Sequence, residues 1–219
     1  SNMTLYSGSL STGEYELTYI GNYKANLFAG RRAFTYKYRF EVDKTNPTYT
    51  LKAGGSTISS GGYTNQQIVY TASDTNFNYI RYKKPTSSSY SSYYSSSYTV
   101  AATEANNGKW YFYATDDMGN TSSTVNVYLD TVKPVGKVTT NLGTTVSNGG
   151  YTNKPFKYTA TDTGGVVNYE IKKAGSSSWT SYTAGTSVSG TNGWYYFRAT
   201  DKAGNVSDEY KIYYDATLP

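Results

Sequence analysis

The sequence predicts an all-β protein made of tandem antiparallel β-sandwiches, and three observations support this prediction. Strand-favouring tyrosine, threonine and valine are frequent, with 27 tyrosines among 219 residues, while 21 glycines can supply turns. Apolar and polar residues alternate with a period of two in several short segments. A long segment also occurs twice, with turn signals about every 8–12 residues, which is typical of a sandwich.

The internal repeat consists of matched motifs at a nearly constant offset. GGYTN occurs at 61–65 and 149–153, YTASD at 70–74 is matched by YTATD at 158–162, and GKWYFYATDDMGN at 108–120 is matched by GWYYFRATDKAGN at 193–205. The offset changes from 88 (149 minus 61) to 85 (193 minus 108), which indicates short loop insertions. The repeat therefore predicts two sandwich units, at 46–134 and 135–219.

Residues 1–45 contain only part of this pattern. Residues 13–17 parallel 108–112, and 40–47 parallel the ends of both units. This segment is predicted to be a partial module or β-hairpin, equivalent to the last two strands of a preceding unit, with a longer connection at 22–32. Residues 1–3 are interpreted as the remnant of an expression tag, and the chain ends in a predicted linker, so we expect a piece of a longer protein.

The alternation predicts which side chains fill each sandwich. In the first unit the expected inward positions are Ile68, Tyr70 and Ala72, then Ile80 and Tyr82, then Trp110, Phe112 and Ala114, and finally Val125, Val127 and Leu129. The second unit repeats them with Phe156, Tyr158, Ala160, Tyr169, Ile171, Tyr195, Phe197, Ala199, Tyr210, Ile212 and Tyr214. The clearest strand of the N-terminal segment contains Phe34, Tyr36, Tyr38, Phe40 and Val42. Two sheets packed face to face would bury both apolar faces.

The serine- and tyrosine-rich stretch at 83–100 has the composition of a low-complexity tract. It aligns with 172–188, and Tyr90 matches Trp179. A disordered linker would not be expected to keep an aromatic residue at a matched position, so this stretch is predicted to be an ordered strand–turn–strand segment.

One repeated turn suggests a family. The pattern Tyr/Phe-x-Ala-Thr-Asp-x-x-Gly-Asn-x-Ser occurs at 112–122 and 197–207, and each copy is followed by a strand and Asp-x-Thr-x-Pro or its near equivalent. Asp can cap such a turn, and Gly119 or Gly204 can supply a positive φ. The pattern resembles bacterial immunoglobulin-like (Ig-like) repeats of surface and secreted proteins, over 46–219 and partly over 1–45.

The resemblance implies tandem Ig-like sandwiches and an extracellular location, at the bacterial cell surface or in a secreted protein. It also implies a non-catalytic spacer or stalk, whose partners are the other modules of the same chain. Two alternatives stay open. One is an adhesion module that binds glycan or host protein through tyrosine-rich loops, and the other is an accessory domain of a secreted hydrolase.

Composition argues against catalysis. The absence of cysteine and histidine excludes thiolate nucleophiles, imidazole bases and the usual zinc sites. The carboxylates recur in both units, as Asp74 with Asp162, Asp116 with Asp201, and Asp130 with Asp215, which is typical of structural positions. We therefore expect no enzymatic site and no cofactor.

A calcium site and a covalent crosslink are two further possibilities for the sequence. Asp116 and Asp117 are adjacent, and junction aspartates can bind calcium, but no EF-hand-like spacing occurs. Turn capping is the preferred interpretation, so no metal is predicted. A lysine–asparagine isopeptide crosslink is left open.

Charge and hydropathy exclude two other classes of partner. The net charge of +5 is spread thinly along the chain, whereas nucleic-acid binding favours clustered positive charge. No apolar stretch is long enough to span a bilayer. We therefore expect neither nucleic-acid binding nor membrane insertion.

The candidate ligand-binding residues are Tyr93, Tyr94 and Tyr98. Neighbouring strand residues face opposite sides, so the three cannot all point inward together with Tyr90. Exposed tyrosines could stack on sugar rings or contact an extracellular protein. The alternative is that they cover the outer face of the sheet as cross-strand pairs.

Overall fold

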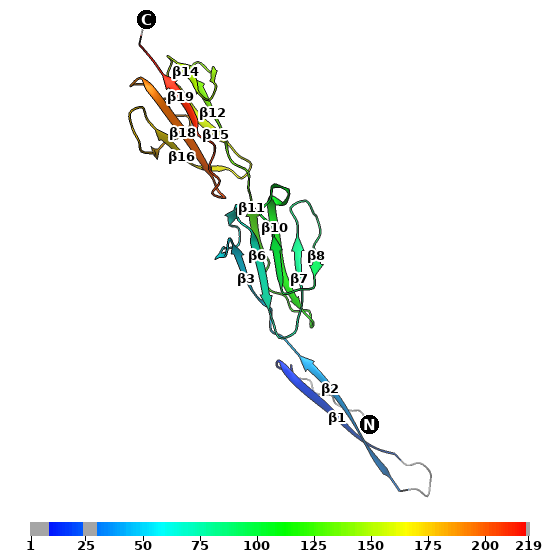
Figure 1. Ribbon diagram of the computed structural model, residues 1–219. Coiled ribbons are helices and arrows are strands. Elements are labelled where there is room, and N and C mark those ends of the chain that lie inside the picture. The colour runs from blue at the N-terminus through cyan, green and yellow to red at the C-terminus, as the bar shows by residue number, and fades with distance from the viewer. Residues whose placement is uncertain (1–8, 24–29, 218–219) are drawn as a thin grey trace.

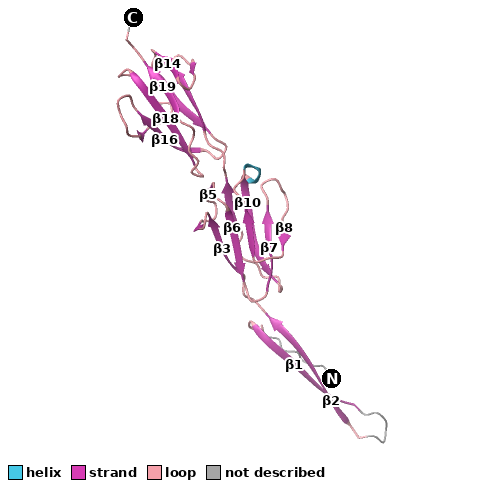
Figure 2. Cartoon of the chain, viewed as in Figure 1, coloured by secondary structure: helices cyan, strands magenta, loops and turns pink. Residues whose placement is uncertain are grey.

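A computed structural model describes residues 9–23 and 30–217 as a β-hairpin followed by two β-sandwiches in a row (Figure 1). The described chain is otherwise strands and loops, except for one short 3-10 helix at Glu104–Asn106 (Figure 2). The predicted fold class is confirmed: the protein is all-β, with tandem Ig-like antiparallel sandwiches preceded by a hairpin.

The hairpin consists of β1 (Gly13–Tyr23) and β2 (Arg32–Val42), which pair over eleven residues. The predicted connection at 22–32 lies largely outside the described residues. Gly13 is opposite Val42, just as Gly108 is opposite Leu129 and Gly193 is opposite Tyr214 in the two sandwiches. The hairpin therefore has the register of the last two strands of a complete unit.

The first sandwich contains nine strands, and the structure describes all of them. They are β3 (Thr48–Ala53), β4 (Ser56–Thr57), β5 (Tyr63–Thr64), β6 (Ile68–Ser73), β7 (Phe77–Lys83), β8 (Ser91–Tyr93), β9 (Ser97–Val100), β10 (Gly108–Asp116) and β11 (Val125–Leu129). One sheet has the order β4-β3-β6-β9 and the other β5-β11-β10-β7-β8. All the pairs are antiparallel except β5 with β11, which is parallel.

The second sandwich repeats this plan with eight strands in its described residues. They are β12 (Val135–Thr140), β13 (Thr145–Val146), β14 (Gly150–Thr152), β15 (Phe156–Thr161), β16 (Val166–Lys172), β17 (Thr180–Ser181), β18 (Gly193–Asp201) and β19 (Tyr210–Tyr214). The sheets have the orders β13-β12-β15 and β14-β19-β18-β16-β17, and β14 is parallel to β19. The boundaries proposed at 45/46 and 134/135 stay a prediction.

Each sandwich has its own core, filled by the side chains that the alternation predicts. In the first unit the predicted residues are buried, apart from Tyr82, which is partly buried and packs against the others. In the second unit Ala160, Tyr169 and Tyr210 are the partly buried members. Aromatic rings dominate both cores: Tyr70 stacks on Phe112 with ring centroids 5.2 Å apart, and Tyr158 stacks on Phe197 at 4.9 Å.

The serine- and tyrosine-rich segment is ordered, but it is not a simple hairpin. Strand β8 pairs with β7 in one sheet, whereas β9 pairs with β6 in the other. The predicted strand–turn–strand segment is therefore a crossing between the two sheets. Alternation cannot reveal this, because it assigns a face to each side chain and not a sheet to each strand.

The serine that ends the repeated turn motif has a structural role in the core. Ser122 Oγ accepts a hydrogen bond from the backbone N–H of Ala114 at 2.9 Å and lies 3.2 Å from the hydroxyl of Tyr70. Ser207 makes the equivalent contacts to Ala199 and Tyr158. Burial raises the pKa of Tyr70 to about 12, so its hydroxyl stays neutral. The motif thus satisfies polar groups that the sandwich buries.

The hydrogen bond between Ser122 and Tyr70 predicts that removing one partner lowers the stability of the sandwich more than removing the other. Ser122→Ala should destabilise the first sandwich by about 1–3 kcal/mol, because it leaves a buried N–H and a buried hydroxyl without a partner. Tyr70→Phe should cost less, because Ser122 keeps its bond to Ala114. Urea unfolding of both variants checks this order, and equal losses would contradict it.

Candidate functional site

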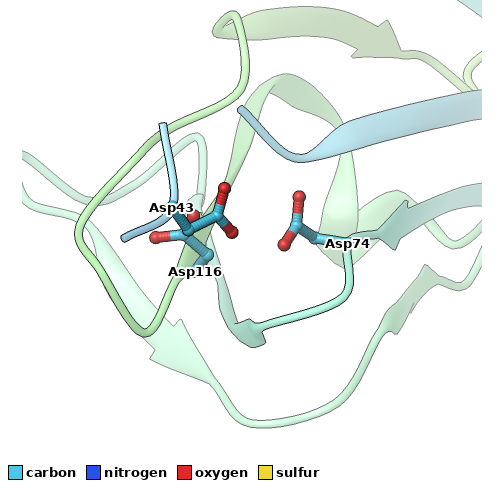
Figure 3. A group of neighbouring side chains, drawn as sticks. All are labelled: Asp43, Asp74 and Asp116. Atoms are coloured by element: carbon cyan, nitrogen blue, oxygen red, sulfur yellow. The ribbon is translucent and has the colours of Figure 1, made fainter. Parts of the chain in front are cut away.

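Aspartates gather at the two junctions of the chain. At each junction, the last strand of the hairpin or of the first sandwich leads into the first strand of the following sandwich. Figure 3 shows the first of these junctions, with Asp43, Asp74 and Asp116 side by side. Their carboxylate oxygens lie within 4.8 Å of one another, as do those of the second group, formed by Asp130, Asp162 and Asp201. Each group combines one linker aspartate with two from the following sandwich.

Asp116 caps the turn that follows β10. Its Oδ1 accepts hydrogen bonds from the backbone N–H groups of Met118 at 2.9 Å and Asn120 at 2.8 Å. Gly119 adopts φ +88° within this turn, a conformation that side chains disfavour. Asp201 caps the equivalent turn through Ala203 and Asn205. The predicted capping role of these aspartates is confirmed.

The asparagine of the same turn reaches across the junction. Asn120 Nδ2 donates to the backbone carbonyl of Asp43 at 3.0 Å and to Asp116 Oδ2 at 2.7 Å. Asn205 Nδ2 makes the same two bonds, to the carbonyl of Asp130 at 2.8 Å and to Asp201 Oδ2 at 2.7 Å. The buried carboxylate therefore orients an amide that holds the incoming linker.

Sequence reasoning placed this asparagine in the turn motif but missed its contact with the linker. The signal was available, since the Asp-x-x-Gly-Asn order occurs in both copies while the two intervening residues differ. A capping aspartate explains the first position and a positive φ explains the glycine, so the asparagine was left without a function. A motif residue that has no role inside its own turn is expected to contact a residue outside that turn.

The two junctions differ at one position. Asn76 Nδ2 donates to Asp43 Oδ2 at 3.1 Å and to Glu41 Oε1 at 2.9 Å. Gly164 occupies the corresponding place in the second group, and its backbone N–H still donates to Asp162 Oδ1 at 2.7 Å. A Cβ at Gly164 would clash with the carboxylate of Asp130. The second group is therefore more tightly packed and lacks the neutral amide of the first.

The linker aspartates of the two junctions also differ in the direction of their pKa shifts. The backbone N–H of Thr45, with a smaller contribution from Asn76, holds the pKa of Asp43 below its ordinary value. Burial raises the pKa of Asp130, and the neighbouring charges of Asp162 and Asp201 raise it further. Similar geometry thus produces opposite pKa shifts at the two junctions.

The carboxylate groups provide only part of a cation site. Three aspartates supply three oxygens when each binds an ion through one oxygen, whereas Ca²⁺ takes six to eight oxygens in proteins. In the first group all three carboxylates already accept hydrogen bonds from Thr45, Asn76, Met118 or Asn120. The hydrogen bonds support the turn-capping interpretation of these residues.

The structure does not bring Tyr93, Tyr94 and Tyr98 together on one surface. Tyr98 is partly buried and packs against Tyr82, with ring centroids 4.3 Å apart, and against the core. Tyr93 contacts the edge of Tyr98 at 5.0 Å. Tyr94 is 76% exposed and lies against Tyr79 on the opposite face. Ligand binding by the three together stays a prediction.

The outer face of the five-stranded sheet in the first unit carries a different aromatic surface. Tyr63 stacks on Tyr128 at 4.5 Å, and the ammonium of Lys109 lies over the rings of Tyr128 and Tyr111, at 5.1 and 5.0 Å from their centroids. Lys83 lies over Tyr111 at 4.2 Å. Sequence reasoning missed these pairs, because cross-strand neighbours are not adjacent in the chain.

The outer aromatic surface is defined by the outward side chains of that sheet. They are Tyr63, Tyr79, Arg81, Lys83, Ser92, Lys109, Tyr111, Tyr113, Thr115, Asn126 and Tyr128. None of these is acidic, although the structure describes every strand of the sheet. In the second unit Lys172 lies over Tyr196 at 4.3 Å in the equivalent place.

No family model matches the chain, and no curated protein does. Fibronectin(III)-like modules of Clostridium thermocellum CbhA match 77% of this chain and 96% of theirs, with 17% identity and a TM-score of 0.32. Bacteroides ovatus SGBP-B, from a mixed-linkage glucan utilization locus and solved with a mixed-linkage heptasaccharide, matches 94% of this chain and 54% of its own, with 11% identity and a TM-score of 0.23.

Among the residues that the structure describes, no helix is long and apolar enough to cross a membrane.

The two linker aspartates should titrate on opposite sides of the ordinary aspartate value of 3.8. Asp43, whose pKa is lowered, stabilises the fold above the unfolded pKa, and this stabilisation is lost as pH falls through its folded pKa. Asp130, whose pKa is raised, carries a cost above its folded pKa that is relieved as pH falls through that value. Carboxyl ¹³C titration by NMR checks both directions.

Asp162→Asn supplies a control for the cause of the second shift. It should lower the pKa of Asp130 by removing one neighbouring negative charge, while Asp43 should be unaffected. If the pKa of Asp130 did not move, the charge of Asp162 would not contribute, and burial together with the charge of Asp201 would explain the rise.

Proposed function

We propose that this chain is a non-catalytic spacer region of a bacterial cell-surface or secreted protein. In this proposal the segments 1–45, 46–134 and 135–219 follow one another end to end and hold other parts of the protein apart. The bacterial and extracellular assignments rest on the turn motif described above. The observation that carries the spacer role is the asparagine-to-linker hydrogen bond, which occurs in the same form at both junctions.

Other features of the linkers also favour a restrained orientation of one unit relative to the next. Each linker ends in a buried proline, Pro47 or Pro134, whose φ is fixed. At the second junction Asn65 Nδ2 also donates to Asn205 Oδ1 at 3.1 Å, and Lys202 lies over the ring of Tyr63. The exposed pair between Lys133 and Asp208 adds little, because solvent screens it. A spacer needs such restraint, since a freely jointed chain would not keep its ends apart.

Asn205→Ala tests the proposal directly. It should leave both sandwiches folded but widen the range of angles between them, because the linker loses its side-chain contact. Residual dipolar couplings measured on both sandwiches should then fit a single alignment tensor for the wild type and two different tensors for the variant.

Asn153→Ala is the matched control, because Asn153 is exposed and directly follows β14, whose last residue Thr152 pairs with Tyr214 near the C-terminal end of the second sandwich. It should behave like the wild type. A wild-type chain whose two sandwiches already require independent tensors would contradict the spacer proposal.

A second candidate function is adhesion to an acidic glycan through the outer aromatic surface. The observation that favours it is Arg81, which is partly buried there and donates through Nη1 to Ser92 at 3.1 Å, while its Nε has no hydrogen-bond partner among the described residues. The equivalent position in the second unit is Glu170, which pairs with Arg198 at 2.6 Å. The first unit thus presents a guanidinium among aromatic rings without a carboxylate, and an acidic sugar would supply one.

Affinity electrophoresis with polygalacturonate in the gel tests this candidate. The wild type should be retarded, whereas Arg81→Gln should migrate as it does in a neutral dextran gel. Lys52→Gln removes the same charge from the other sheet and should keep the retardation. Equal migration of all three proteins in both gels would rule the candidate out for this polysaccharide class.

A further inference from the structure

The N-terminal hairpin has one apolar face that the described residues leave uncovered. The apolar hairpin face consists of Tyr15, Leu17, Tyr19, Tyr23, Phe34, Tyr36, Tyr38, Phe40 and Val42, which the strand register places on one side. Cross-strand contacts such as Tyr15 with Phe40, at 5.6 Å between ring centroids, join them into one surface. Six of the nine side chains are 42–65% exposed.

The same positions are buried in both sandwiches. Tyr15 and Leu17 correspond to Trp110 and Phe112, which are at most 3% exposed beneath the opposing sheet. Figure 1 shows that the hairpin extends away from the first sandwich, so that sandwich does not supply an opposing sheet. In the described residues β1 and β2 pair only with each other, whereas β10 and β11 have outer neighbours in β7 and β5. A two-stranded sheet of this kind is at best marginally stable alone in water.

We propose that the apolar hairpin face binds the same face of a second copy of this chain. The two hairpins pack as opposing sheets and form a small sandwich around a twofold axis. The middle of the ladder is the pair Thr18–Lys37, so the axis passes close to Leu17, Tyr19 and their partners on the apolar face. This contact is isologous, because each hairpin presents the same surface to the other.

The available area is sufficient for such a contact. Half-exposed aromatic and leucine side chains each bury roughly 100 Å², so the six most exposed residues supply about 600 Å² per copy and about 1,200 Å² in total. That value reaches the lower limit of stable specific interfaces, and the partly buried Tyr15, Phe40 and Val42 extend it. Apolar patches of this size on soluble proteins mark interaction sites.

The distribution of charge also fits a second copy. Glu14, Glu16, Lys37, Arg39 and Glu41 all lie on the opposite face by register, where Glu16 pairs with Lys37 and Arg39 at 2.9 Å. Among the described residues of the apolar face only Arg32 is charged, and it lies at the end of the ladder. Two such faces can approach without burying a charge near their centre.

Sedimentation equilibrium of the complete 219-residue chain tests the proposal. The wild type should be mainly dimeric at about 100 µM, a concentration well above the roughly micromolar dissociation constant of the weaker interfaces of standard size. Tyr36→Glu should weaken the dimer by about tenfold or more, because it buries an unpaired charge. Ile20→Glu is the matched control: Ile20 is 66% exposed, as Tyr36 is 65% exposed, but it lies on the opposite face. This variant should remain dimeric.

Hydrogen exchange gives a readout that does not depend on a variant. Amide exchange in β1 and β2 should slow as the protein concentration rises, while exchange in β10 should not change. A wild-type chain that stays monomeric at about 100 µM would overturn the proposal and leave a preceding chain segment or another protein as the occupant of the face. Equal weakening by Tyr36→Glu and Ile20→Glu would also overturn it, because the contact would then not involve the apolar face.

Discussion

The organisation of this protein depends on a side-chain amide that is held by a buried carboxylate and donates to the backbone of an incoming linker. Asp116 and Asp201 are almost fully buried, and each orients one asparagine toward the linker carbonyl. The cost of desolvating these carboxylates is offset by backbone N–H groups of the same turn. A turn that completes one sandwich therefore also positions the preceding element, so the fold of each unit and the connection between units are not independent.

Much of the fold follows from the sequence, because the repeat and the alternation are strong signals. Positions such as Ile80, Trp110 and Val127 are buried as predicted, since a two-residue period fixes the face of each side chain. The pairing of β8 and β9 with different sheets was not predictable in the same way, because it depends on the chain crossing from one layer to the other.

The junctions were less predictable than the cores. The capping aspartates were assigned correctly from the turn chemistry, but the contact from Asn120 to the linker joins residues that are 77 positions apart. The pKa of Asp43 is lowered mainly by the backbone N–H of Thr45, whereas the pKa of Asp130 is raised mainly by burial and further by two neighbouring carboxylates, and only the assembled junctions show these surroundings. Likewise, the tyrosines expected to act as a group separate, because Tyr93, at the end of β8, contacts Tyr98, whereas Tyr94, just after β8, contacts Tyr79.

The parallel pairing within each sandwich has a mechanical consequence. Strand β5 near the beginning of the first unit is bonded to β11 at its end, through contacts such as Tyr128 N–H to the carbonyl of Gly62 at 2.9 Å. A pull on the two ends of the unit draws these parallel strands in opposite directions along their length. Their hydrogen bonds are then loaded together in shear, and they do not open one at a time as in a hairpin peeled from its tip. The second unit has the same geometry in β14 and β19, so tensile force along the chain acts on each sandwich in the same way.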